Sequence, residues 1–139
     1  CVYAQEGYDC DGNAILHIGD QYAGGIVFQI NEDGTGLVAD LQDIGEMDWF
    51  DAMDVAESST SQGYEDWYLP NTVELVLMHN TIGYGGPDGN IGGFSYSYYW
   101  SSELSFGVYA VGFIDGPGGY NVVLDSQYSS LRVRAIRAF

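Results

Sequence analysis

The sequence predicts a single α+β domain. Segments typical of strands come first, two helical segments follow, and strand-like segments return to the C-terminus, without the regular alternation of strand and helix that marks a parallel sheet. A length of 139 residues suits one domain. Hydrophobic residues make up 46% of the chain, with twelve Tyr, six Phe and three Trp, so there is ample apolar surface for a core despite many carboxylates. We place the domain at residues 19–139 and regard residues 1–18 as a polar lead segment.

The lead segment carries both cysteines of the chain, Cys1 and Cys10. We expect them to form a disulfide in an extracellular protein. A lipid-modified Cys1, or pairing with cysteines outside this sequence, are the alternatives. Asp9 and Asp11 of the same segment are either calcium ligands or part of an Asx-type turn next to Gly12.

The domain begins with a predicted β-hairpin. Residues 24–30 and 37–41 are rich in β-branched and other apolar residues, and they flank the turn residues 31–36. An Asp-Gly pair between two such runs is a strong hairpin signal.

Two helices are then predicted. In residues 48–59 the apolar side chains recur with helical spacing, at Trp49, Ala52, Met53 and Ala56. The second helix begins after Pro70 and extends to about residue 80. Asn71 and Glu74 have the spacing of a capping box, in which each side chain accepts from the backbone N–H of the other residue.

A glycine-rich segment, residues 82–93, follows the second helix and is expected to form a long surface loop. Aromatic residues alternate with serine and tyrosine from residue 94 to residue 101, which predicts a strand. Tyr84, Tyr96 and Tyr98 are candidates for a ligand-binding or assembly surface, because tyrosine offers an apolar face with a polar edge. The alternative is that these rings belong to the core.

Three further strands are predicted, at residues 106–115, 120–125 and 131–139. The last contains every cation of the chain apart from histidine, Arg132, Arg134 and Arg137, and there is no lysine. Three cations alternating with apolar residues in one strand are expected to be internal ties to carboxylates or carbonyls. Asp66 and Glu74 are the candidate partners.

The formal net charge of −17 limits the partners. Nucleic acids, anionic lipids and sulfated glycans are bound mainly through Lys and Arg, so we expect none of them as partners. No apolar run reaches the length of about 18–20 residues that spans a bilayer, so direct membrane insertion is not expected. Calcium is a candidate cofactor, because clustered carboxylates bind it well; the candidate ligands are Asp9, Asp11, Asp88 and Asp115.

Catalysis is not expected. The sequence has neither a Gly-x-Ser-x-Gly nor a His-Glu-x-x-His motif. Its two histidines are His17 in the lead segment and His79 among the apolar residues of the second helix, where a packed or capping role is the expected one.

Four ordered motifs resemble a known family. They are Trp49-x-x-Ala52, the run from Gly63 to Leu75 that contains Asp66-Trp-Tyr-Leu-Pro-Asn71 and Glu74-Leu75, Tyr99-Trp-Ser-Ser102, and Val133-Arg-Ala-Ile-Arg137. In this order and spacing they resemble the DUF1566 family, the C-terminal domain of the Legionella collagen-like adhesin. The resemblance covers residues 19–139 and implies a C-type lectin-like fold, with two helices packed on a twisted antiparallel sheet and long loops. We expect structural roles for Trp49, Trp67, Leu69, Pro70, Glu74, Trp100, Arg134 and Arg137.

The expected function is that of a non-catalytic adhesion module on a bacterial cell surface, or otherwise outside the cell. The chain departs from the named adhesin in lacking lysine, so a neutral glycan or a protein is the expected ligand. Leu69-Pro70-Asn71 opens a helix, which differs from the calcium-binding triplet of sugar-binding C-type lectins. The alternative is a structural subunit that assembles with itself into a fibre or trimer.

Overall fold

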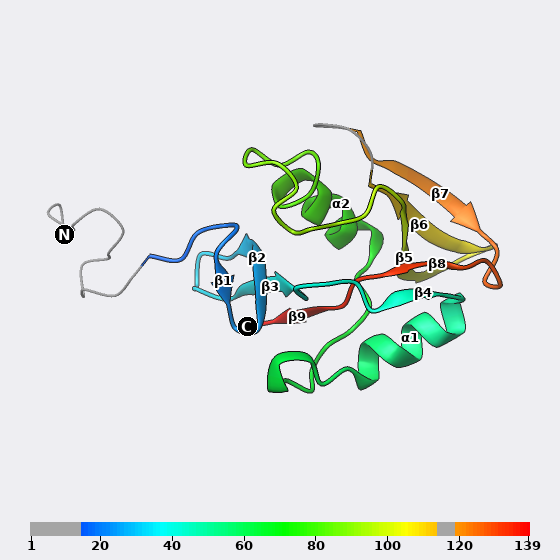
Figure 1. The fold of residues 1–139 in the computed structure, drawn as a ribbon, viewed down its shortest axis with the longest axis horizontal. Helices are drawn as coiled ribbons and strands as arrows, with labels where there is room; N and C mark the ends of the chain where they lie inside the picture. The colour runs from blue at the N-terminus through cyan, green and yellow to red at the C-terminus, as the bar shows by residue number, and fades with distance from the viewer. Residues whose placement is uncertain (1–14, 114–118) are drawn as a thin grey trace, which may run out of the picture.

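A computed structural model describes residues 15–113 and 119–139. Within these residues the fold is α+β, as the sequence predicts, with two α-helices and two β-sheets (Figure 1). The expected disulfide, Cys1 with Cys10, and three of the candidate calcium ligands, Asp9, Asp11 and Asp115, lie outside the described residues.

The first sheet is antiparallel throughout and has the strand order β1-β2-β3-β9. Its strands are β1 (Gln21–Tyr22), β2 (Gly25–Ile30), β3 (Gly36–Ala39) and β9 (Ile136–Ala138). β2 and β3 form the predicted hairpin. It depends on close backbone approach, because a Cβ added to Gly25 would collide with the Ala39 carbonyl oxygen, and one added to Gly36 with that of Gln29.

The second sheet is mixed and has the order β4-β8-β5-β6-β7. Its strands are β4 (Gly45–Met47), β8 (Leu131–Val133), β5 (Tyr98–Leu104), β6 (Val108–Gly112) and β7 (Asn121–Asp125). The β5–β8 pair is parallel and the other pairs are antiparallel. The single antiparallel sheet implied by the resemblance is therefore wrong for the described chain.

The C-terminal segment is divided between the two sheets. One continuous strand was expected over residues 131–139, but β8 ends at Val133 and β9 begins at Ile136 in the other sheet. The segment between β3 and β4 bulges opposite this break. The Asp40 N–H donates to the Ala135 carbonyl and the Ile44 N–H donates to the Val133 carbonyl, both at 2.9 Å. Residues 41–43, between these two bonds, therefore lie opposite Arg134. The break has a physical reason, because Arg134 turns inward at this point, with 1% of its surface exposed.

Both helices form where the sequence predicts them. In α1 (Trp49–Ser58) the Asp48 carboxylate caps the N-terminus by accepting from the Asp51 N–H. α2 (Thr72–Thr81) begins with the predicted capping box between Asn71 and Glu74. A 3-10 turn, η1 (Ser61–Gly63), lies between the helices.

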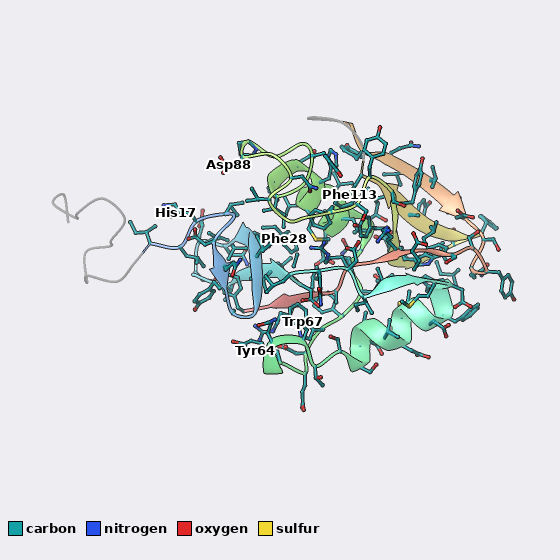
Figure 2. All side chains as sticks on the ribbon, in the orientation of Figure 1. His17, Phe28, Tyr64, Trp67, Asp88 and Phe113 are labelled. Carbon is teal, nitrogen blue, oxygen red and sulfur yellow. The ribbon has the colours of Figure 1, made fainter. Side chains whose placement is uncertain are left out.

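The two helices lie on opposite sides of the second sheet (Figure 1). One hydrophobic cluster joins α2 to Tyr99 and Phe113, and the other joins α1 to Trp100. Phe113 is labelled in the interior in Figure 2. Tyr99 and Trp100 are neighbours in β5 and neither is exposed, because each face of this strand is covered by a different helix. The predicted alternation over residues 94–101 is therefore only partly right, since residues 94–97 precede the strand.

Candidate ligand-binding site

Arg134 fastens the glycine-rich loop to the body of the protein. Its Nε donates to the Asp43 carboxylate at 2.8 Å. Nη1 donates to the backbone carbonyls of Asp40 (2.9 Å) and Gly92 (2.7 Å), and Nη2 to that of Gly93 (3.2 Å). The planar guanidinium thus joins the bulge at residues 41–43 to residues 92–93 of the loop, using the fixed directions of its donors.

Asp43 is the centre of this network. One of its oxygens accepts from Arg134, and the other accepts from the Tyr99 hydroxyl at 2.8 Å and from Arg132 at 3.2 Å. The Tyr99 hydroxyl also accepts from the Ser95 N–H at 2.8 Å. Burial, followed by the negative charge of Asp43, raises the pKa of the Tyr99 hydroxyl well above its usual range. The phenol therefore stays protonated and serves as a structural donor.

Arg137 supports the turn between β1 and β2. Nε and Nη2 contact both oxygens of Asp66, at 2.7 and 3.0 Å, while Nη1 donates to the Ala23 carbonyl at 2.7 Å. The guanidinium carbon lies 3.7 Å from the centroid of the Tyr64 ring. The hydrogen bond from Arg137 lowers the pKa of the Asp66 carboxyl below its usual value. Ala23 has a φ of +53°, so this carbonyl contact stabilises a backbone conformation that alanine rarely adopts.

Of the two expected partners for the arginines, Asp66 contacts Arg137 and Glu74 contacts neither. Glu74 accepts instead from the Asn71 N–H at 2.9 Å and from the Tyr68 hydroxyl at 3.3 Å. The sequence did not single out Asp43 as the partner of Arg134, since the two residues lie 91 positions apart.

Next to the turn that Arg137 supports, Tyr22 lines two hollows. The larger has a volume of about 450 Å³ and the smaller about 280 Å³, and both are lined by Gln21 and Tyr22. The Tyr22 side chain is 51% exposed, and its ring packs edge-on against Phe139 with the centroids 5.1 Å apart. In Figure 1 the C-terminus accordingly lies beside β1. We call this surface the Tyr22 groove; its larger hollow is also lined by Ile15, Leu16, Asp20, Gly34 and Phe139, and its smaller one by Ala23, Gly24, Gly25, Leu41 and Gln62.

The Tyr22 groove combines flat apolar surface with neutral or acidic polar groups. Gln21 and Gln62 are exposed and offer both donors and acceptors, whereas Asp20 offers acceptors only. The Asp20 carboxylate already accepts from the His17 N–H at 2.8 Å, which holds its orientation. No lysine or arginine lines either hollow. Such a surface can stack against a ring and bind hydroxyl groups, but it does not attract an anion.

The tyrosines that the sequence favoured as a binding surface are only partly available. Tyr96 is 60% exposed and packs edge-on against Tyr84, with centroids 5.8 Å apart. The Tyr84 hydroxyl donates to the Phe94 carbonyl at 3.0 Å, and the Tyr98 hydroxyl accepts from the Asn121 side chain at 3.2 Å. Tyr84 and Tyr98 are therefore half-buried parts of the framework, and Tyr96 is the one ring of the three that faces solvent.

The residues given structural roles are integrated into the framework. The three indole N–H groups each donate to a backbone carbonyl: Trp49 to Ser101, Trp67 to Ser61 and Trp100 to Met47, at 2.8–3.0 Å. Leu69 is 3% exposed. The Pro70 carbonyl accepts from the Ser102 N–H at 2.9 Å, which fixes the entry into α2.

Asp88, the fourth candidate calcium ligand, lies exposed at the outer end of the glycine-rich loop (Figure 2). Over residues 15–113 and 119–139, no group of three or more His, Cys, Asp or Glu side chains is arranged to hold a metal ion. Calcium binding stays a prediction, since three of its four proposed ligands lie outside those residues.

The Tyr22 groove could not be found from sequence patterns. Tyr22 and Phe139 are far apart in the sequence and belong to, or directly follow, the two outer strands of the first sheet, β1 and β9, yet their rings are in contact. The signal that was present is the pair of glycines at 19 and 24, whose positive φ angles permit the turns on either side of β1.

Two comparisons were made with known families and curated proteins. No family model matches the chain, and no curated protein matches its sequence. The resemblance to the DUF1566 family thus stays a prediction. Within the described residues, neither helix has the length and apolar character needed to cross a bilayer.

Proposed function

We propose that this protein is a non-catalytic binding module of an extracellular or bacterial cell-surface protein, and that the Tyr22 groove binds a neutral saccharide. The observation that carries the proposal is a pair of hollows that share one exposed aromatic residue, Tyr22, in their lining. A C-type lectin-like fold and membership of the DUF1566 family are part of the same proposal. The four ordered sequence motifs, and two helices packed on a sheet, support them.

A saccharide suits the groove chemically. The ring of Tyr22 offers a flat apolar face to the C–H groups of a sugar, and its edge contact with Phe139 keeps it in place. Sugar hydroxyls both donate and accept, and the side chains of Gln21, Gln62 and Asp20 match them.

The charge distribution favours a neutral ligand. Arg134 and Arg137 are 1% and 8% exposed, and Arg132 is paired with Asp43 and Glu46. No arginine is therefore available to a sulfate or phosphate, and the remaining field is negative.

The test is a glycan array that contains neutral and sulfated glycans, followed by calorimetric titration of the neutral glycans that bind. Tyr22→Ala should lower the affinity by about tenfold, which is the size of one lost stacking contact. Tyr128→Ala is the matched control, because Tyr128 is 80% exposed and lies in the β7–β8 connection, outside the groove. Equal binding by the Tyr22→Ala variant, or a preference for sulfated glycans, would contradict the proposal.

A further inference from the structure

β7 is an edge strand that lacks lysine, proline and a bulge, three features that often protect an edge. It pairs with β6 on one side, and within the described chain no strand pairs with its other side (Figure 1). Natural edge strands are commonly blocked by lysine, proline or a bulge. β7 has the sequence Asn-Val-Val-Leu-Asp, contains neither lysine nor proline, and pairs with β6 over five residues without a register shift.

The side chains of β7 alternate between the two faces of the sheet. Val123 is opposite Ala110 and packs against the α1 cluster. Val122 and Leu124 point to the other face, where they are 39% and 50% exposed. Two aliphatic side chains that are neighbours on one face of this strand are thus exposed to solvent in a protein of formal net charge −17.

The sequence of β7 is complementary to itself in the antiparallel direction. Pairing two copies about Val123 places Asn121 opposite Asp125 and Val122 opposite Leu124, each pair occurring twice. An amide thus faces a carboxylate and an aliphatic side chain faces another, so no two carboxylates are directly opposed. Directly opposed side chains of this kind stabilise a sheet, whereas like charges destabilise it.

The surroundings of β7 extend this apolar edge. At its C-terminal end, Asp125 pairs with Val108, which itself pairs with Leu104, so the β5–β6 turn lies at the same end. Leu104 and Phe106 of this turn are 52% and 103% exposed. Tyr120 precedes the strand and is 36% exposed. The two-fold arrangement brings Tyr120 of each copy towards the turn of the other.

We propose that two copies of this chain associate by antiparallel pairing of their β7 strands, which joins the two five-stranded sheets into one. This surface is separate from the Tyr22 groove, because β1 and β7 belong to different sheets and lie at opposite sides of the molecule (Figure 1). The proposed dimer therefore does not depend on saccharide binding in the Tyr22 groove.

The net charge sets the expected strength. Two bodies of charge −17 repel each other, while the contact itself is apolar and made by backbone hydrogen bonds. The association is therefore expected to be weak at low ionic strength and to strengthen as salt screens the repulsion.

The test is sedimentation velocity of the full chain from micromolar to millimolar concentration, at low and high salt. The double variant Val122→Glu/Leu124→Glu places carboxylates opposite each other and should lower the association constant at least about tenfold. The double variant Val122→Glu/Leu124→Lys places opposite charges across the axis and should restore the dimer. This rescue is expected from the proposed register because it places residue 122 of one copy opposite residue 124 of the other.

Two controls isolate the effect. Ile30→Lys adds a lysine to an aliphatic position of similar exposure, 37%, in the other sheet, and it should not promote association. Thermal unfolding of each variant shows that the fold is retained. A wild-type chain that stays monomeric throughout, or a failure of the opposite-charge variant to restore the dimer, would overturn the proposal.

Discussion

Truncation of Arg134 should destabilise the protein far more than truncation of Arg132, although both residues contact Asp43. Arg134→Ala removes the donors to the buried carbonyls of Asp40 and Gly92 and one of the two cations that contact Asp43. An unsatisfied buried acceptor costs about 1–3 kcal/mol. Two such acceptors and a broken buried ion pair give an expected loss of about 3–5 kcal/mol in the free energy of unfolding.

The matched control is Arg132→Ala. Arg132 is 32% exposed, and its second partner, Glu46, is 54% exposed, so water replaces most of what is lost. Exposed ion pairs contribute about 0–1 kcal/mol. Because Asp43 retains Arg134 and the Tyr99 hydroxyl in this variant, no buried charge is left alone.

The measurement is urea and thermal unfolding followed by circular dichroism. For a domain of this size, the loss expected for Arg134→Ala corresponds to a decrease in Tm of about 10–20 °C. Hydrogen exchange should also become faster at residues 92–93, since Arg134 binds both of their carbonyls and so holds this part of the loop against the body of the protein. Equal effects of the two substitutions would refute the assignment of Arg134 as the internal tie.

Two further predictions follow from the described contacts. Gly25→Ala should lower the free energy of unfolding by about 1–3 kcal/mol, because the added Cβ collides with the backbone of Ala39. Urea denaturation measures this loss. An unchanged midpoint would show that β2 and β3 can move apart without a loss of stability. Burial, followed by the negative charge of Glu74, raises the pKa of the Tyr68 hydroxyl to about 12 from its ordinary value of 10.0. A raised folded-state pKa means that the stability is fully present below pH 10.0 and is lost as the pH rises towards about 12. Urea unfolding over this range should show a shallower decline for Tyr68→Phe than for the wild type, and equal slopes would count against the assignment.

Local patterns predicted the elements of the fold well. The hairpin of β2 and β3, both helix starts and the β6–β7 pair depend on turn residues, capping residues and periodicity that lie within a few positions of each other. The capping box of α2 is the clearest case, because Asn71 and Glu74 make both of its hydrogen bonds within four residues of chain.

Features that depend on contacts between distant parts of the chain could not be predicted from local sequence patterns. The break at Arg134 depends on the bulge at residues 41–43 and the residue before it, because the Asp40 carbonyl and the Asp43 carboxylate accept from the guanidinium. Nothing in Leu131–Phe139 alone shows that its first half pairs with β4 and its second half with β3. The Tyr22 groove has the same origin, since it exists only once β9 has joined the sheet that contains β1.

All three arginines bind carboxylates or carbonyls of the protein itself, and this limits the kinds of ligand that the protein can bind. Arg134 and Arg137 are nearly inaccessible and Arg132 is paired, so the described surface has no arginine free to bind an anion. Contacts must then come from aromatic faces, amides and backbone edges, as in the Tyr22 groove and β7.

The dependence of binding on salt distinguishes these contacts from electrostatic adhesion. Electrostatic adhesion to a polyanion weakens as salt screens it, with a screening length of about 10 Å at 0.1 M. Binding of a neutral saccharide should instead be insensitive to salt, and pairing of two acidic copies should strengthen with it. A titration in which both interactions weakened with added salt would show that exposed cations, and not the groove and the edge strand, carry recognition.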